Sequence, residues 1–426
     1  MFGLFALMVG LFAVGTPIAF SMALAAAVYM HFVIGVPLEG LPQRMVGGLD
    51  TFPLLAIPFF ILAGNLMNTG GITARLVTFA KVLVGHITGG LSHAVVVTNM
   101  IMAGMSGSAV ADAAGTGSVL IPAMKSAGYP MPYSAAIVAA ASVIGPIIPP
   151  SIPFVIYGSI ANVSIGRLLL AGAVPGVLMG IFLIIFGYFI AKKRDYPSGE
   201  RATCGEMASA FVHALPPLGM PAIIVGGIVF GIMTPTEAAS AGAAYALVLG
   251  LFVYKELKWR DLPKIITESS VGTASIAVII AAAQPFAWVL TIEQAPQKLL
   301  ETFIQLNLEQ WQIFLILNFV FFMLGMFMEG LAALIMAVPV LLPLIAHANI
   351  DPVHFGVVFV VNIMIGLITP PVGMAMYVVC ALSKVPIIEF VKEVWPFIIA
   401  EVIALAIITY WPEMVLWLPN LLLPAR

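Results

Sequence analysis

Serine and acidic side chains lie beside glycines at two places in an otherwise apolar chain. The first place contains Ser106, Ser108 and Asp112, and the second contains Glu329. Ionisable residues within apolar spans are costly and usually serve function. Hydroxyl and carbonyl oxygens are the ligands that hard cations prefer. These residue types therefore indicate a site for a small cation, an anionic substrate, or both.

Structural roles compete with this interpretation. The Asp112 carboxylate could cap a helix by accepting hydrogen bonds from free backbone N–H groups, and we give its two roles equal weight. For Glu329 we favour a functional role. Glu237 ends a Thr-Pro-Thr-Glu sequence that is typical of a helix start, so we expect it to cap.

Two double prolines interrupt apolar stretches, at Pro149-Pro150 and at Pro370-Pro371. A continuous helix cannot contain them, because two N–H donors are missing and the rings clash with the preceding turn. The freed carbonyls are tolerated in a membrane only where they are buried in protein or line a cavity. Such carbonyls can coordinate a cation, and helix N-termini nearby attract anions.

These features belong to an internal repeat. Gly104 and Gly325 are separated by 325 − 104 = 221 residues. The same separation relates three further landmarks to their counterparts: Pro122 to Pro343, Gly145 to Gly366, and Pro149-Pro150 to Pro370-Pro371. The offset also places Ser108 opposite Glu329. Paired interruptions in two halves point to the binding site of a secondary transporter, and we expect two re-entrant hairpins whose tips meet opposite the proline breaks.

The composition is that of a polytopic all-α membrane protein. Of 426 residues, 62% are hydrophobic and 8% charged, with a mean hydropathy of +1.12. At about 20 residues for each crossing, ten to twelve spans are expected. The net charge of −2 argues against nucleic-acid binding. Cys204 and Cys380 form no disulfide pattern, and no Gly-Lys step of a nucleotide-binding loop occurs. An ion gradient is therefore the expected energy source.

Basic residues predict the orientation in the membrane. Lysine and arginine cluster in two segments, 192–201 and 255–264. The positive-inside rule places both in the cytoplasm, so the apolar stretch between them must cross twice, with a break near Thr234. The region around Arg44, which corresponds to 255–264, has a single arginine. This asymmetry indicates that the two repeats are inverted.

Several motifs occur in order through the chain and carry a family resemblance. They are Ile57-Pro58-Phe59-Phe60-Ile61-Leu62-Ala63-Gly64, Ser106-Gly107-Ser108, Gly145-Pro146-x-x-Pro149-Pro150-Ser151, Ala171-Gly172-Ala173-Val174-Pro175-Gly176 and Gly366-x-x-Thr369-Pro370-Pro371-x-Gly373. With them the sequence resembles, over essentially its whole length, the large membrane subunit of tripartite ATP-independent periplasmic (TRAP) transporters.

The resemblance implies an inverted-repeat elevator-type secondary transporter with two re-entrant helical hairpins and broken helices. Such carriers import organic acids, such as C4-dicarboxylates, sialic acid or related sugar acids, across the bacterial inner membrane. Sodium is the coupling ion, and no other cofactor is implied. The expected partners are a small membrane subunit, here a separate chain, and a periplasmic substrate-binding protein.

The resemblance also implies a division of the chain. The expected parts are scaffold helices of the first repeat (1–48), a transport-domain repeat (49–190), a cytoplasmic linker (191–210), scaffold helices of the second repeat (211–265), a second transport-domain repeat (266–391) and a C-terminal helix (392–426). The hairpins are expected near 105–122 and 326–343.

Residue by residue, the resemblance implies two sodium sites formed mostly by backbone carbonyls. The first consists of Ser106, Ser108, Gly145, Ile148 and Pro149, and the second of Gly325, Gly366, Thr369 and Gly373. Asp112 lies at the first hairpin tip. We expect Ser108, Ser151 and Glu329 to contact the substrate. Neither tip contains an arginine, so carboxylate recognition would rest on hydroxyls, backbone N–H groups and bound sodium.

Other functions share some of these features. Duplicated re-entrant hairpins also build channels, and an anion channel or a proton-coupled carrier of the same architecture remains an alternative. An intramembrane enzyme would need a catalytic pair, and only Asp112 and Glu329 are suitable acids. No reaction-partner motif accompanies them, so we expect no enzymatic activity.

Overall fold

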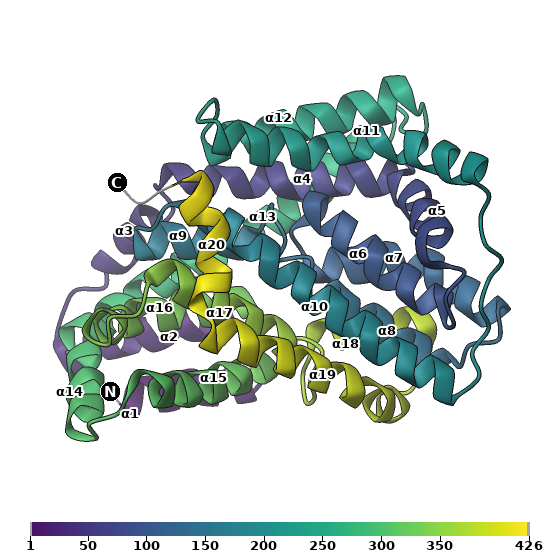
Figure 1. The fold of residues 1–426 in the computed structure, drawn as a ribbon. Helices are drawn as coiled ribbons and strands as arrows, with labels where there is room; N and C mark the ends of the chain where they lie inside the picture. Colours follow the sequence, from purple (N-terminus) through teal and green to yellow (C-terminus); the bar gives the residue numbers. More distant parts are fainter. Residues whose placement is uncertain (1, 424–426) are drawn as a thin grey trace.

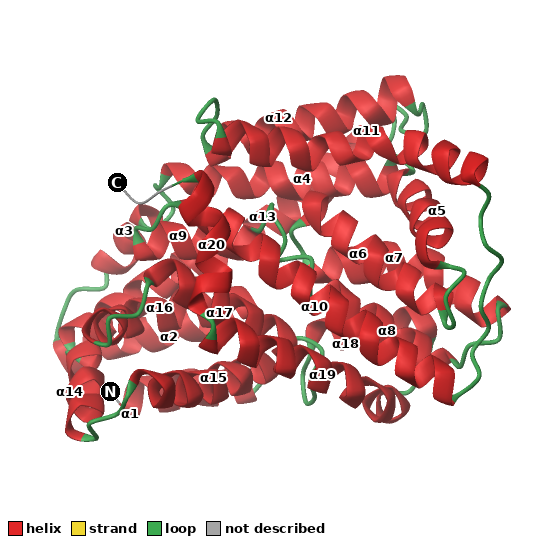
Figure 2. Ribbon diagram, viewed as in Figure 1, coloured by secondary structure: helices red, strands yellow, loops and turns green. Residues whose placement is uncertain are grey.

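The computed structural model describes residues 2–423, and these residues form helices and connecting loops without any strand (Figure 2). Met1 and residues 424–426, and with them the outer ends of the predicted segments 1–48 and 392–426, lie outside the described residues. The first half contains α1 (Phe2–Ala13), α2 (Ile18–Tyr29), η1 (Met30–Ile34), α3 (Gly40–Gly47), η2 (Phe52–Leu55), α4 (Ala56–Thr69), α5 (Ile72–Val84), α6 (Gly90–Ser106), α7 (Ala109–Ser126), α8 (Met131–Ser142), α9 (Ile152–Ala161) and α10 (Ile165–Lys193).

The second half follows after a loop at residues 194–203, which lies within the predicted linker 191–210. It contains α11 (Cys204–Val229), α12 (Pro235–Val248), η3 (Leu249–Val253), α13 (Leu262–Ile292), α14 (Ala295–Gln305), α15 (Gln310–Phe327), α16 (Gly330–His347), α17 (Pro352–Gly366), α18 (Met374–Ser383), α19 (Ile387–Tyr410) and α20 (Pro412–Leu422).

Within the described residues, seven helices are long and apolar enough to cross a membrane, and eight if α19 and α20, bent by 64°, count as one span. The ten to twelve spans expected from apolar stretches exceed this number. The reason is that shorter apolar helices, such as α6, α8, α9, α17 and α18, are arms of hairpins or halves of interrupted spans. The molecule is nevertheless an all-α polytopic membrane protein, as predicted.

Two helical hairpins and two interrupted spans form the core of the fold. The first hairpin is α6–α7 and is followed by the interrupted pair α8 and α9; the second is α15–α16 and is followed by α17 and α18. The segments predicted near 105–122 and 326–343 cover the turn of each hairpin and most of the hairpin's second helix, α7 or α16. The first helix of each hairpin lies outside them, because an apolar helix gives no sequence signal that it turns back.

The two hairpins enter the molecule from opposite sides. The first begins beside the linker, where the Gly89 N–H donates to the Pro197 carbonyl (3.3 Å). Helix α19 also begins there, since Arg194 forms an ion pair with Glu393 (2.7 Å). The second hairpin begins at the far end of α19, where the Tyr410 hydroxyl donates to the Trp311 carbonyl (3.3 Å). This arrangement confirms the predicted inverted repeat.

Long helices frame the hairpins. In Figure 1, α4, α11 and α12 form a layer along one edge of the molecule, and α13 passes beneath them. The segment α3–α4 corresponds to α13 in the second repeat but is interrupted at residues 48–51. At this interruption Gly48 lies against α13, where an added Cβ would be 2.0 Å from Gln284 Cγ. A larger residue at this position would clash with the Gln284 side chain unless that side chain moved.

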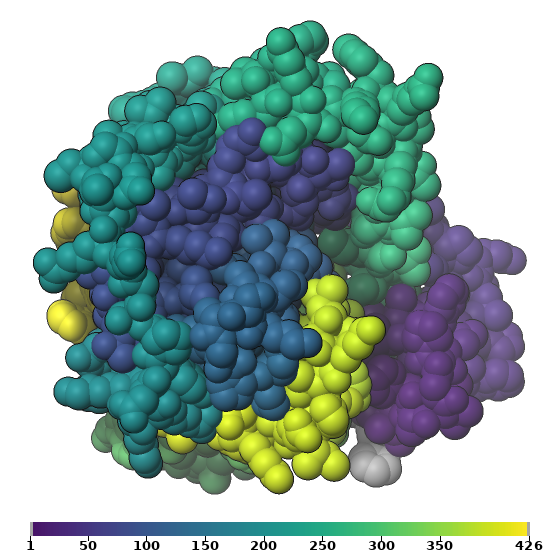
Figure 3. Space-filling view, turned by 90° about the vertical axis from the view of Figure 1, so that its right-hand side faces the viewer, coloured from purple at the N-terminus to yellow at the C-terminus, as the bar shows by residue number. Residues whose placement is uncertain are grey.

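We call the side of the molecule that carries residues 194–203 the linker side, and the other end the opposite side. The linker runs along the right edge of Figure 1. Figure 3 views the molecule from the linker side and shows a hollow between the N-terminal helices, in purple, and the segment around α18, in yellow-green. The linker itself is held by Tyr129, whose hydroxyl donates to the Pro197 carbonyl (3.1 Å).

Candidate functional site

The turn of the first hairpin is built from three small residues. Helix α6 ends at Ser106, Gly107 adopts a left-handed conformation (φ 60°), and Ser108 caps α7 by accepting a hydrogen bond from the Ala111 N–H (3.4 Å). A positive φ is accessible to glycine without strain, which fixes the place of the turn. The serine pair of the motif thus lies at the tip of the hairpin.

Asp112 is tied to this tip from the first turn of α7. The Ser106 hydroxyl donates to Asp112 Oδ1 (2.5 Å) and accepts a hydrogen bond from the Ser108 N–H (3.3 Å). The second carboxylate oxygen, Oδ2, is buried and has no hydrogen-bond partner among the described residues. Asp112 therefore does not cap the helix, a role that Ser108 takes, and it presents a free oxygen inside the protein.

The hairpin tip packs on the interrupted span of the same repeat. Helix α8 ends at Ser142 and α9 begins at Ile152, with a cis peptide bond between Pro149 and Pro150. An added Cβ on Gly107 would lie 2.9 Å from the Pro150 carbonyl oxygen. The backbone of the tip and the carbonyls of the break therefore approach each other closely.

Ser151 organises the second part of this break. Its hydroxyl donates to the Pro146 carbonyl and accepts a hydrogen bond from the Phe154 N–H (3.3 Å), so that it caps α9. The residue is completely buried. In this conformation both hydrogen bonds of the hydroxyl remain within the break, and the predicted contact of Ser151 with substrate would have to compete with them.

The tip of the second hairpin has the same plan with different residues. Met328 is extended, and Glu329 caps α16 by accepting a hydrogen bond from the Ala332 N–H on Oε2 (3.0 Å). The Val372 N–H of the second break donates to the Met326 carbonyl (3.2 Å). As in the first repeat, the tip lies on the break of its own repeat.

Two glycines allow the helices of the second repeat to touch. An added Cβ on Gly366 would lie 2.4 Å from the carbonyl carbon of Gly325, and one on Gly325 would lie 2.8 Å from the Ile363 carbonyl oxygen. The backbones of α15 and α17 are therefore in direct contact. This close approach explains why the repeat places glycine at both positions.

The second break directs carbonyl groups toward one point. The break contains a cis peptide bond between Pro370 and Pro371. Gly373 has φ 32°, and an added Cβ there would lie 2.9 Å from the Leu367 carbonyl oxygen and 3.0 Å from that of Thr369. The Thr369 hydroxyl donates to the Ile365 carbonyl (2.9 Å), which leaves lone pairs of its oxygen for another partner.

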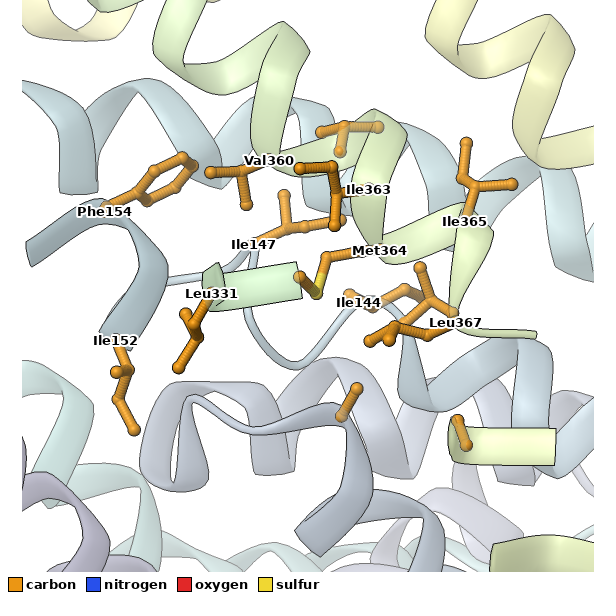
Figure 4. Packing of buried hydrophobic residues seen from close by; sticks show 14 of the residues in the cluster. Ile144, Ile147, Ile152, Phe154, Leu331, Val360, Ile363, Met364, Ile365 and Leu367 are labelled. Atoms are coloured by element: carbon orange, nitrogen blue, oxygen red, sulfur yellow. The ribbon is translucent and has the colours of Figure 1, made fainter. Parts of the chain in front are cut away.

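The structure thus groups the residues of each predicted sodium site within one repeat. Ser106, Ser108, Gly145, Ile148 and Pro149 belong to the first tip and break, whereas Gly325, Gly366, Thr369 and Gly373 belong to the second. Apolar residues join the two halves. Figure 4 shows Ile147 of the first break between Leu331, at the start of α16, and Met364, and shows Ile144 beside Met364 and Leu367 near the second break.

The chemistry available is that of oxygen donors in an apolar surrounding. No group of three or more His, Cys, Asp or Glu side chains within residues 2–423 could hold a metal ion. A cation at either break would instead be coordinated by carbonyls and hydroxyls, which suit an alkali cation. The N-termini of α7 and α16 at the tips, and of α9 after the first break, suit an anion.

The structure buries one further acid, which the repeat does not point to. Glu401 in α19 is completely buried, and neither of its carboxylate oxygens has a hydrogen-bond partner in the described part of the chain. The signal was present, because Glu401 is the single charge in the apolar run from Trp395 to Tyr410. It is not part of either hairpin or break, which is where the repeat directed attention.

The chain is similar to known proteins over nearly its full length. A family model described as "Tripartite ATP-independent periplasmic transporter, DctM component" matches residues 5–414. The sialic acid TRAP transporter large permease protein SiaM of Vibrio cholerae is 42% identical over 414 residues, covering 97% of each chain. The C4-dicarboxylate TRAP transporter large permease protein DctM of Rhodobacter capsulatus is 36% identical over 433 residues, covering 98% of each.

A solved structure shares the fold. The YdaH transporter of Alcanivorax borkumensis matches with a TM-score of 0.65, covering 90% of both chains at 14% sequence identity. The two proteins therefore share a fold although few of their aligned residues are identical.

Proposed function

The chain belongs to the DctM family of tripartite ATP-independent periplasmic transporters, and we propose that it imports a small organic acid anion together with sodium ions. As a large permease it is a multi-pass protein of the bacterial inner membrane, a transporter and not an enzyme. The observation that carries the proposal is the pairing of each hairpin tip with the proline break of its own repeat, in two inverted copies.

Sodium coupling is supported by the oxygen atoms that lie where each hairpin tip meets the proline break of its repeat. In the first repeat these are the Ser106 hydroxyl, the Asp112 carboxylate and the carbonyls of the break. In the second they are the carbonyls of Leu367 and Thr369. The sites we propose are the two sets that the resemblance implies. The Asp112 carboxylate lowers the cost of holding a cation in an apolar interior.

The proposed substrate class follows from the relatives and from the helix N-termini. SiaM is named for sialic acid and DctM for C4-dicarboxylates, both of which carry a carboxylate. We place the substrate carboxylate between the tips, with Ser108 and Glu329 as contacts and with Ser151 available if its internal hydrogen bonds open. Bound sodium would supply the positive charge that these residues lack.

The proposed transport cycle is of the elevator type. Sodium ions organise the tips, and the anion then binds. The two hairpin–break units, as parts of the transport-domain repeats 49–190 and 266–391, then move together against the scaffold helices of residues 1–48 and 211–265. A ligand shifts an equilibrium only by its differential affinity, so sodium and the anion must each strengthen the binding of the other.

Two further components would complete the transporter. We propose a small membrane subunit and a periplasmic substrate-binding protein as partners, consistent with the three-part family. The basic linker would face the cytoplasm by the positive-inside rule, and the opposite side the periplasm.

Uptake into proteoliposomes tests the proposal. The chain and its small subunit are reconstituted, and a binding protein is added outside with sialic acid or succinate, with and without an inward sodium gradient. We expect uptake that requires both sodium and the binding protein. Uptake driven equally well by a proton gradient without sodium would favour the proton-coupled alternative, with Asp112 and Glu329 as the titrating groups. Conductance without saturation would favour a channel.

A further inference from the structure

A cavity of ligand size lies away from the hairpin tips. It has a volume of about 550 Å³ and is enclosed by α3, α9, α13 and α16, which lie together on one side of Figure 1. It is lined by Ile156 and Ile160 of α9 and by Ile335 and Pro339 of α16. At 1.5 Å for each helical residue, these positions are on the order of 10 Å beyond Ser151 and Glu329.

The cavity is on the side opposite the linker. Helix α9 runs from the first break to Ala161, and α10 then returns from Ile165 to the linker at Lys193. Thr51, which lines the cavity, precedes Phe52, whose carbonyl accepts a hydrogen bond from Thr236 at the start of α12 (3.3 Å). That start follows the end of α11, which is the end remote from the linker. Substrate arriving from the opposite side would meet this cavity before the tips.

Arg44 is the single charged residue among the described residues that line the cavity. Its guanidinium carbon lies 4.0 Å from the centre of the Trp288 ring. Its Nε atom is buried without a hydrogen-bond partner, and within residues 2–423 Arg44 forms no ion pair. A guanidinium has five N–H donors and no acceptor. A guanidinium whose Nε is buried and unpaired therefore lacks the acceptor, usually a carboxylate, that a buried arginine binds.

The geometry suits a carboxylate. Stacking on Trp288 orients the plane of the guanidinium, and a planar fork of donors matches the two oxygens of a carboxylate. Neutral hydrogen-bonding groups surround it, namely the side chains of Thr51, Ser159 and Gln284. Within residues 2–423 no acidic residue lines the cavity to compete for Arg44. A volume of about 550 Å³ is within the range of small-molecule sites.

We propose that this cavity is a second anion site, in which Arg44 binds a carboxylate of the organic acid on its way between the opposite side and the hairpin tips. The inference rests on the proposed function for the identity of the anion. It also provides the arginine that both tips lack. Because α3 belongs to the predicted scaffold whereas α9, α16 and most of α13 belong to the predicted transport-domain repeats, any movement of the hairpins against the scaffold changes the cavity.

Cysteine protection tests the site without relying on transport. Ser159→Cys is introduced together with Cys204→Ser, which removes the exposed native thiol, whereas Cys380 is buried. The purified chain in nanodiscs, without sodium, is labelled with N-ethylmaleimide in the presence of succinate or sialic acid. At ten times the half-saturating concentration, the anion should slow labelling about tenfold. When Arg44→Gln is added to this variant, the anion concentration needed should rise about 10- to 100-fold.

Uptake kinetics supply the second readout. Arg44→Gln should raise KM for the anion about tenfold while the sodium dependence is unchanged, and Arg44→Lys should have an intermediate KM because it keeps the charge and loses the fork. Lys298→Gln is the matched control, since it removes an exposed positive charge from α14. Its KM should equal that of the wild type.

The outcomes separate the two proposals. If wild-type uptake ignores sodium while the anion still protects the introduced cysteine through Arg44, the coupling proposal fails and the second site stands. If the anion does not protect this cysteine, or protects it equally with Arg44→Gln, the second site is overturned whatever the uptake shows. Equal KM values for Arg44→Gln and Lys298→Gln would overturn it as well.

Discussion

The free oxygen of Asp112 faces Gly145 so closely that an added Cβ at this glycine would lie 2.3 Å from Oδ2. Asp112 belongs to the first hairpin and Gly145 to the break after α8, so the contact joins the two parts of the proposed first sodium site. The contact also explains the glycine in physical terms. A side chain at this position would keep Oδ2 from reaching the backbone of the break while Ser106 holds the other oxygen, Oδ1.

Gly145→Ala should therefore abolish sodium-dependent uptake. The added methyl group displaces the Asp112 carboxylate, and overpacking of this kind costs about 1–3 kcal/mol. Gly10→Ala is the control, since no described residue lies within 4 Å of a Cβ there. Uptake and thermal unfolding are measured for both variants. Normal sodium dependence in Gly145→Ala would mean that the contact with Asp112 has no part in coupling.

Gly366→Ala tests the second repeat independently. The added Cβ would meet the Gly325 backbone, which cannot move aside as a flexible side chain can. We expect α15 and α17 to separate, with loss of uptake and a lower melting temperature. Because the proposed sodium sites are distinct, sodium should still protect the first tip from proteolysis in this variant. Loss of protection at both tips would show that the sites are not independent.

Glu329 has a capping role that can be separated from a substrate role. Glu329→Ala removes the cap of α16 and should lower stability by about 1 kcal/mol. Glu329→Gln retains an acceptor oxygen and should keep the melting temperature, yet raise KM for the anion if the carboxylate contacts substrate hydroxyls. Thermal unfolding and uptake are compared for the two variants. An unchanged KM in Glu329→Gln would leave capping as the function of this residue.

Spacing in the sequence predicted the framework of the fold well. The constant offset located both tips and both breaks, because interruptions of apolar helices are local and leave glycine and proline in the sequence. The capping role of Glu237 is confirmed, since Thr234 and Glu237 exchange hydrogen bonds (Thr234 N–H to Glu237 Oε2, 2.7 Å). At the tips the structure shows which residues cap: Glu329 caps α16, and Ser108 rather than Asp112 caps α7. The functional role of Glu329 stays a prediction.

Contacts between distant parts of the chain cannot be predicted from local patterns in the sequence. Arg44 and Trp288 are separated by most of the chain, and no repeat offset relates them. In the sequence, Arg44 is informative only through its charge, which bears on the membrane topology. Its stacking on Trp288 and its position in a cavity depend on how α3 packs on α13. Glu401 was missed for a related reason, because its burial is set by the helices α8 and α10 that pack against α19.

Asp112→Asn distinguishes sodium coupling from proton coupling. The amide keeps an acceptor for the Ser106 hydroxyl but removes the negative charge, so the fold should be retained. We expect the sodium concentration for half-maximal uptake to rise about tenfold or more, since a charged ligand to the cation is lost. The measurement is uptake against sodium concentration at several fixed pH values. Sodium dependence equal to the wild type, with loss of pH dependence, would instead assign Asp112 to a proton.

Glu401→Met should make the protein more stable. Both oxygens of Glu401 are buried without partners among the described residues, and the free energy lost by such groups is about 1–3 kcal/mol each. Methionine has a similar length and no polar atoms, so it removes this cost while filling the space between α19 and its neighbours. The melting temperature should rise, and uptake should stay within about twofold of the wild type because no hydrogen bond within residues 2–423 joins Glu401 to a tip or break. A stable variant without uptake would show that the protein retains this acid for coupling, at the expense of stability.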